Sequence, residues 1–196
     1  MVEKIVEELR LLTFDVERAY HSWTIFQSSV RNFEPPQEEL IKAIDSRSIG
    51  PTVNHLQMVL LHDCVSCLCR VTDEHRADRI TLNSIMIDIR SAFAAHNPSE
   101  VKTIDAIRKA ISKSSSLNEM RVFRNNQLGH ILRIETPQTR YNAIPVLIDD
   151  LLRFLDAAFK ICGDARWIGQ PTKSRMDRLA AEFWNCIEDG ARARAK

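Results

Sequence analysis

The first 30 residues carry apolar side chains at alternating spacings of three and four positions. Such spacing places these side chains in one stripe along an α-helix. We therefore predict a helix of about eight turns, which needs a long packing partner. Either the internal bundle of this chain or a dimer contact could cover the stripe, and the pattern does not distinguish the two. The stripe consists of Ile5, Leu9, Leu12, Val16, Ala19, Trp23, Phe26 and Val30.

Prolines and a glycine divide the next part of the chain. Pro35-Pro36 ends the first helix, because proline disfavours helical geometry in the preceding residue and cannot donate a backbone hydrogen bond. A short helix is expected over 36–46. Another long helix follows Gly50-Pro51 and runs to the charged segment 73–79. Its apolar positions are Leu56, Leu60, Cys64, Cys67 and Val71.

Two shorter helices come next. One begins near Thr81, and the other has Asn97 as its cap and Pro98 in its first turn. Ser116 and Glu119 then form a capping-box pattern, which predicts the start of a further helix at that point. The apolar positions of the first two are Leu82, Ile85, Met86, Ile89 and Phe93, followed by Val101, Ile104, Ile107 and Ile111.

The chain closes with a predicted pair of helices. The first covers about 141–162 and stops at Gly163, and the second covers about 172–189. Their apolar positions are Ile144, Leu147, Leu151, Leu155 and Ala158, and then Leu179, Phe183 and Ile187. No strand pattern or internal repeat is found. We therefore predict an all-α protein, with a single domain over 1–190 and a basic C-terminal tail over 191–196.

Charge is balanced over the whole chain but not along it. The formal net charge is +1, so no global field favours nucleic acid or an anionic membrane. Residues 102–140 hold eight basic and three acidic side chains, a local charge of +5, whereas residues 1–20 hold three basic and five acidic. No apolar run approaches the length that spans a membrane. Positive charge is thus concentrated in the second half of the chain, where a solvated helix face is the plain alternative to a binding surface.

Cysteine use predicts a reducing compartment. Five cysteines are an odd number, and no secretory leader pattern precedes them, so we expect a cytoplasmic protein without a disulfide framework. His62, Cys64, Cys67 and Cys69 contain a C-x2-C spacing, which could suggest zinc. Because these residues sit inside an apolar helical run and no second pair follows, core packing is the favoured interpretation. We predict no metal and no cofactor.

Three arginines are followed by a histidine five or six residues later. They are Arg70 with His75, Arg90 with His96, and Arg124 with His130, so spacing alone does not select one of them. The residue after the arginine selects one of the three, because only Arg124 is followed by an amide, Asn125. The segment Arg-Asn-Asn-Gln-Leu-Gly-His at 124–130 resembles the R[N/D/H]x4H signature of the HEPN superfamily (higher eukaryotes and prokaryotes nucleotide-binding).

A second, shorter match points to one branch of that superfamily. Arg70-Val-Thr-Asp73, leading to Thr81-Leu82, is similar to the abortive-infection (AbiU-type) branch. The resemblance implies an up-and-down HEPN helical bundle with additional N- and C-terminal helices. It also implies a homodimer in which the two motifs face each other, a role as toxin or phage-defence effector, and an antitoxin protein as a possible partner.

The reaction that the resemblance implies is metal-independent cleavage of RNA, in which the ribose 2′-hydroxyl attacks its own phosphodiester. His130 would transfer protons near neutral pH, Arg124 would stabilise the charge on phosphate oxygens, and Asn125 would orient neighbouring groups. Three neighbours of the motif are candidates for RNA binding: Arg121, Asn126 and Arg133. One position departs from HEPN toxins that an antitoxin silences by modifying a tyrosine two residues after the histidine, because Leu132 stands there.

Helix geometry limits how this motif can work. Six residues place Arg124 and His130 about 120° apart and roughly 9 Å along a regular helix. One helix therefore cannot aim both side chains at one phosphate, unless it is distorted near Gly129 or a second chain completes the site. A non-catalytic alternative also stands: Arg124 pairs with an acid of its own chain, and the protein is a helical binding or dimerisation module.

Overall fold

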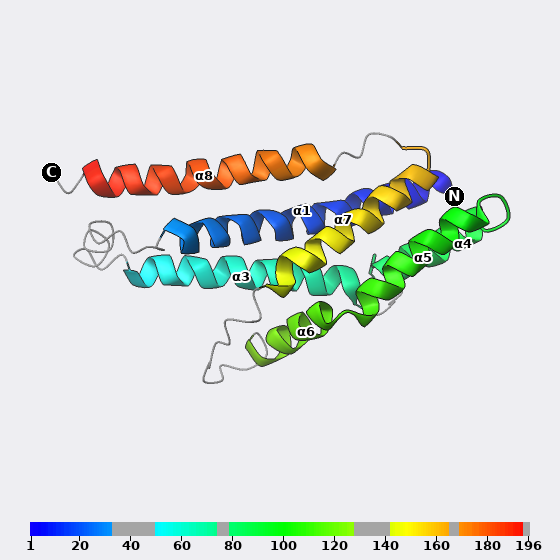
Figure 1. The fold of residues 1–196 in the computed structure, drawn as a ribbon, viewed down its shortest axis with the longest axis horizontal. Coiled ribbons are helices and arrows are strands. Elements are labelled where there is room, and N and C mark those ends of the chain that lie inside the picture. The colour runs from blue at the N-terminus through cyan, green and yellow to red at the C-terminus, as the bar shows by residue number, and fades with distance from the viewer. Residues whose placement is uncertain (33–49, 74–78, 128–141, 165–168, 194–196) are drawn as a thin grey trace. The chain divides into compact units, whose positions relative to one another are not determined.

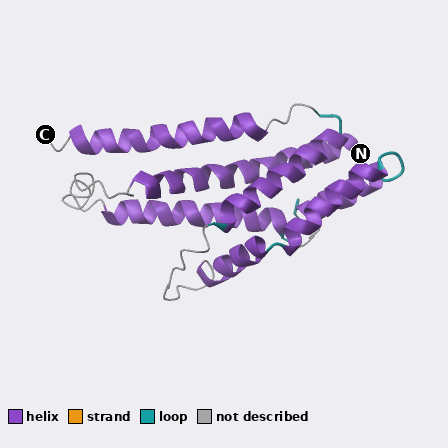
Figure 2. Ribbon diagram, in the orientation of Figure 1, coloured by secondary structure: helices purple, strands orange, loops and turns teal. Residues whose placement is uncertain are grey.

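The computed structural model describes residues 1–32, 50–73, 79–127, 142–164 and 169–193. Over these ranges the chain forms seven α-helices and no strand, which confirms the predicted all-α class (Figures 1 and 2). The predicted short helix over 36–46 lies outside the described residues. The helices are α1 (Val2–Asn32), α3 (Gly50–Thr72), α4 (Leu82–Phe93), α5 (Pro98–Lys113), α6 (Ser115–Gln127), α7 (Ala143–Ile161) and α8 (Gly169–Ala193).

The chain divides into two compact units, and both α1 and α3 contribute to each. Unit 1 comprises Met1–Ala19 and Val65–Gly169, and unit 2 comprises Tyr20–Cys64 and Gln170–Lys196. A single domain over 1–190 remains a prediction. Helix α8 continues to Ala193 and so includes the first residues of the segment expected as a tail.

From Ile5 to Phe26 the apolar stripe of α1 is buried in the chain's own core, and the side chain of Val30 lies outside the described residues. Ile5, Leu9 and Val16 are fully buried, and Leu12 is 2% exposed. This answers the question that the pattern left open, because a stripe already covered within the chain is not available to a second copy. Outside the stripe, the exposed large apolar side chains of α1 include Val2, Leu11 and Phe14, which are 39%, 55% and 64% exposed.

Within unit 1, α7 has two helices as neighbours. Helices α5 and α6 both contact α7, and α4 packs against α5. Every predicted apolar position of α7 is buried, which explains why this helix attracts two neighbours. Gly163 ends α7 with a positive φ of 73°, as expected of a glycine stop. The Gly163 and Asp164 amides donate back to the carbonyls of Lys160 and Phe159, at 3.1 Å each, and so satisfy the end of the helix.

Short polar residues precede three of these helices, and two of them cap the helix with their side chains. Thr81 caps α4 through a reciprocal pair of bonds with Ser84, a capping box that the sequence reading did not identify. Pro98 occupies the first turn of α5 as predicted, but the Asn97 side chain makes no capping bond. The capping box predicted at Ser116 and Glu119 is wrong. Helix α6 already includes Ser115, and the Ser114 hydroxyl accepts from the Leu117 amide at 3.1 Å.

In unit 2, the apolar face of α8 differs from the predicted one. Leu179 and Phe183 were expected inside, yet they are 37% and 40% exposed, whereas Ala180 and Trp184 are buried. The Trp184 indole nitrogen donates to the Ile25 carbonyl at 2.7 Å. Burial of Trp184, with its N–H hydrogen-bonded, is more favourable than burial of Leu179 and Phe183, because the indole ring removes more apolar surface from water.

The cysteines of α3 are core residues. Cys64, Cys67 and Cys69 are buried and reduced, and burial raises the pKa of Cys69 to about 11. A thiol with that pKa stays protonated at neutral pH and is a poor metal ligand. In the described ranges, no three His, Cys, Asp or Glu side chains are arranged to hold a metal ion.

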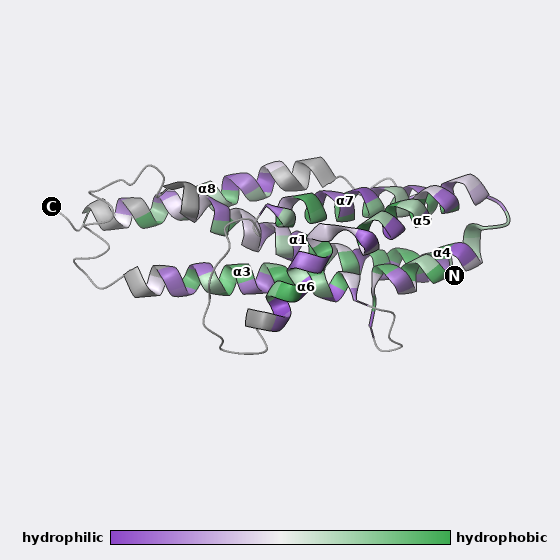
Figure 3. Cartoon of the chain, turned by 60° about the horizontal axis from the view of Figure 1, so that its bottom comes forward, coloured by the Kyte–Doolittle hydropathy of each residue, from purple (hydrophilic) through white to green (hydrophobic). Residues whose placement is uncertain are grey.

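Figure 3 shows that α3, α4 and α7 each carry both hydrophobic and hydrophilic residues, as amphipathic helices do. None of the described helices has the length and hydrophobicity needed to cross a membrane.

Candidate functional site

The Arg124-Asn125 pair lies in the last turn of α6, within unit 1. Leu117, Met120 and Phe123 are buried on this helix, which packs against α7. Arg124 lies on the same arc as Leu117 and Met120, as the helical wheel predicts. Its side chain is 31% exposed, so the guanidinium is neither free in solvent nor fully buried.

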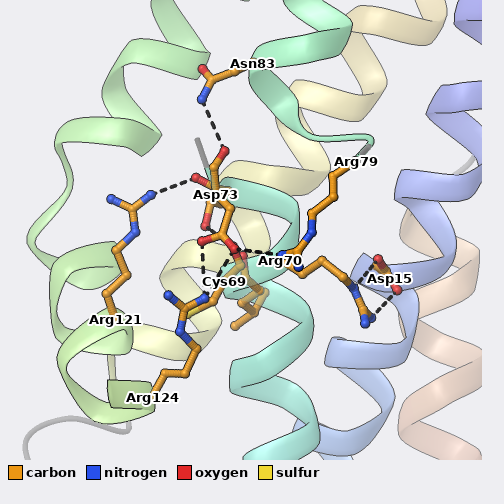
Figure 4. Close-up of polar contacts among 10 residues, drawn as sticks. Asp15, Cys69, Arg70, Asp73, Arg79, Asn83, Arg121 and Arg124 are labelled. Carbon is orange, nitrogen blue, oxygen red and sulfur yellow. Dashed lines mark hydrogen bonds and ion pairs between the residues drawn. The ribbon is translucent and has the colours of Figure 1, made fainter. Parts of the chain in front are cut away.

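A carboxylate of the same chain pairs with Arg124. Nη1 of Arg124 donates to both oxygens of Asp73, at 3.2 and 3.4 Å. Asp73 directly follows α3, is 22% exposed and also pairs with Arg79 at 3.7 Å (Figure 4). Because a lone charge on this apolar arc is costly, Arg124 needs an anion or a carboxylate beside it, and in this structure the group is a carboxylate.

Arg121 satisfies the end of α3. Its Nη2 donates to the Thr72 carbonyl at 2.8 Å. The last carbonyls of a helix have no partner within the helix, and the helix dipole makes cations favourable there. Arg121 and Arg124 are three residues apart and therefore share a face of α6. Both arginines thus tie α6 to the C-terminal end of α3.

Further polar side chains extend this contact on either side. Asn83 of α4 donates to the Asp73 carbonyl at 3.4 Å. Arg70 binds both oxygens of Asp15, at 2.9 and 2.6 Å (Figure 4). The hydrogen bonds to Asp15 raise the pKa of Arg70, although its partial burial opposes them. This bidentate pair uses the guanidinium fork of Arg70 and joins α3 to α1.

The thiol beside this cluster carries no charge. Burial raises the pKa of Cys69 to about 11, which outweighs the lowering effect of Arg124 and Arg121 nearby. Cys69 is therefore no nucleophile at neutral pH, because the thiolate is the reactive form. The chemistry available at this end of α3 comes from guanidinium and carboxylate groups.

The structure brings together only part of the predicted site. It places Arg121 and Arg124 side by side on α6, with Asn125 exposed next to them. His130, Arg133 and the side chain of Asn126 lie outside the described residues. The distance from Arg124 to the histidine, and the site shared between two chains, therefore remain predictions.

Three residues around the motif were not assigned to the site from sequence: Asp73, Arg79 and Asn83. Asp73 lies 51 positions from Arg124, and no helical periodicity relates residues on different helices. The only sequence signal was the Arg70-Val-Thr-Asp73 similarity, which pointed to a branch of a family and not to a contact.

A comparison with known protein families finds a match over most of the chain. The sequence model of the AbiU2 family of HEPN proteins matches residues 2–170. The chain belongs to the AbiU2 HEPN family. The match includes Asp15, Asp73 and the motif segment 124–130. No curated protein and no solved structure matched the chain.

The family assignment confirms the predicted HEPN bundle of the AbiU branch, a domain type related to abortive infection. The matched range ends at Gln170, the second residue of α8, so most of α8 lies beyond the match. The prediction of an additional C-terminal helix is consistent with that boundary.

Proposed function

We propose that this AbiU2-family protein is a metal-independent endoribonuclease that acts as an abortive-infection effector. The observation that carries the proposal is the oriented guanidinium of Arg124. Asp73 holds Arg124 through Nη1, and within the described part of the chain no bond occupies its Nη2 or Nε. A guanidinium held by one carboxylate can still present its remaining N–H donors to a phosphate.

The proposed reaction divides the work among three residues. The ribose 2′-hydroxyl attacks the adjacent phosphorus, the P–O5′ bond breaks, and the products are a 2′,3′-cyclic phosphate and a 5′-hydroxyl. His130 transfers the proton, Arg124 stabilises the charge on the non-bridging oxygens, and Asn125 orients the phosphate from its exposed position. Arg121, Asn126 and Arg133 contact the RNA on either side. No metal is required, and DNA without the 2′-hydroxyl is inert.

The test is cleavage of RNA in EDTA by purified protein. Wild type should cleave RNA but not DNA of the same sequence, and Arg124→Ala and His130→Ala should each lose at least about 100-fold in rate. Arg153→Ala is the matched control, since Arg153 is 74% exposed on α7 of the same unit. Cleavage that survives both substitutions would show that other residues, or a contaminant, cut the RNA.

We further propose that two chains combine their motifs in a homodimer, because one regular helix separates Arg124 and His130 by about 120°. Size-exclusion chromatography with light scattering should give twice the 22.5 kDa of the chain. Mixing Arg124→Ala and His130→Ala chains should restore about a quarter of wild-type activity. About half of the dimers are then mixed, and each mixed dimer contains one intact composite site out of two. A site within one chain gives no rescue.

One observation favours a second candidate, a non-catalytic binding module. Arg121 and Arg124 both join α6 to the end of α3, which is a sufficient structural reason for both arginines. In that case wild-type protein leaves RNA intact in every condition, while Arg124→Ala lowers the melting temperature.

A further inference from the structure

A second cluster of cations lies next to the motif, on α4 and α5 of unit 1. Asp105 of α5 accepts from Nε of Arg108 at 3.0 Å and from Nζ of Lys109 at 2.9 Å, and it also pairs with Arg90 of α4. Arg90 and Lys109 are 46% and 58% exposed, whereas Asp105 is 14% exposed. One carboxylate therefore holds three cations, of which Arg90 and Lys109 are exposed and Arg108 is 19% exposed.

Hydrogen bonds connect this cluster to Arg124. Nη1 of Arg108 donates to the Asn83 side-chain oxygen at 2.7 Å, and the Asn83 amide nitrogen donates to the Asp73 carbonyl at 3.4 Å. Asp73 in turn holds Arg124 and Arg79. Asn83 and Arg90 are seven residues apart, so they share one face of α4 and are separated by about 10.5 Å along it. The two clusters thus form one continuous network.

This network has a large excess of positive charge. Six cationic side chains take part in it, and the only carboxylates that they contact among the described residues are Asp73 and Asp105, which leaves a net charge of +4. Stability alone does not call for such an excess, because like charges repel and exposed pairs contribute little. A polyanion would neutralise it. The cations are Arg79, Arg90, Arg108, Lys109, Arg121 and Arg124, and we call them the basic track.

We propose that the basic track binds the phosphate backbone of the RNA substrate, from the phosphate at Arg124 to the far end at Arg90 and Lys109. The proposal rests on the proposed ribonuclease function and names how its substrate is held. All six side chains are arginine or lysine, which contact phosphates and carry no information about base identity through such contacts. The track therefore supplies affinity that depends on salt and not on sequence.

The test measures binding of RNA that cannot be cleaved. Fluorescence anisotropy with a labelled 2′-O-methyl oligonucleotide, over a series of NaCl concentrations, gives Kd and its salt dependence. The double variant R90Q/K109Q should bind more weakly, and the slope of log K against log salt should shrink by about 1.4, or about 0.7 for each lost contact to a single strand. R79Q should shrink it by about 0.7.

The matched control is K4Q/R153Q, which removes two exposed cations of the same unit that also pair with carboxylates. Both double variants remove two positive charges, so a general effect of net charge should be the same in each. If the basic track is the binding surface, the salt slope of K4Q/R153Q should equal that of wild type. Equal slopes for K4Q/R153Q and R90Q/K109Q would overturn the proposal. Polyglutamate that competes as well as RNA would assign the surface to an acidic protein and overturn it too.

The two proposals fail in distinguishable ways. If the track variants lose affinity for 2′-O-methyl RNA but wild type never cleaves ordinary RNA, the ribonuclease proposal is wrong and the track stands. If wild type cleaves RNA and R90Q/K109Q cleaves it with unchanged KM, the track is wrong and the ribonuclease stands. Circular dichroism checks that each variant is folded. If R90Q/K109Q does not fold, the salt slope of R79Q still tests the basic track.

Discussion

Arg124 of α6 donates from Nη1 to both carboxylate oxygens of Asp73, at 3.2 and 3.4 Å, across 51 positions of the sequence. This one contact joins the first residue of the candidate catalytic motif to the end of α3. It can serve the fold by fixing α6, and it can serve a site by orienting the guanidinium. The two roles are separable by experiment.

Exchanging the two charges should separate stability from activity. Asp73→Ala and Arg124→Ala should each destabilise the protein, with a coupling of about 0.5 to 1 kcal/mol in a double-mutant cycle, because the pair is partly exposed. The swap D73R/R124D should recover part of that stability, as measured by urea unfolding. It should not recover RNA cleavage, because the guanidinium then lies after the end of α3 and not on α6. Cleavage by the swapped protein would show that Arg124 is not the phosphate-stabilising group.

The start of α6 should depend on Ser114 and not on Ser116. Ser114→Ala removes the acceptor of the Leu117 amide and should cost about 1 kcal/mol. Ser116→Ala is the matched control and should be neutral or slightly stabilising, since alanine is the better helix former inside a helix. Thermal unfolding of the two variants gives the answer. A larger loss from Ser116→Ala would restore the capping box read from the sequence.

Two leucines on α1 should respond very differently to truncation. Leu9 is fully buried, whereas Leu11 is 55% exposed. Leu9→Ala should lower the free energy of unfolding by about 2–5 kcal/mol, because it removes apolar contact and leaves a cavity. Leu11→Ala should stay within about 0.5 kcal/mol of wild type. Similar losses from both, measured in urea, would mean that Leu11 is covered in solution, for example by a second chain.

Asp105 should contribute to stability above its folded-state pKa. Partial burial would raise the pKa of this carboxyl, but hydrogen bonds from Lys109 and Arg108 and the charge of Arg90 lower it below the usual 3.8. The unfolded state therefore takes up a proton first as the pH falls. The contribution is complete above pH 3.8 and is lost as the pH drops through the lower folded-state value.

Asp105→Asn checks this linkage. The variant should be less stable than wild type at pH 7, and the difference should shrink as the pH falls below 3.8. The measurement is the urea midpoint from pH 3 to 7. The control is Asp150→Asn, which removes the 30% exposed carboxylate of the ion pair with Arg153. A difference that grows toward low pH would contradict the assigned direction of the pKa shift.

Much of the fold was readable from local pattern. The spacing of apolar residues located α1, α3, α4, α5 and α7 and identified most of their buried positions, because helical periodicity reports which face avoids water. Gly163 and Pro98 marked helix ends through their own backbone preferences. Asn125 singled out one of three arginine-to-histidine spacings, and the AbiU2 family match confirmed the branch.

Other features depended on contacts between helices. The inward face of α8 was decided by Trp184 and its bond to the Ile25 carbonyl, and the cap of α6 by the geometry of Ser114. Most of all, the sequence by itself determined that Arg124 needs an anion, because its place on an apolar arc makes a lone charge costly. Only the tertiary structure decided that Asp73 supplies it, since chain folding alone brings the end of α3 to the last turn of α6.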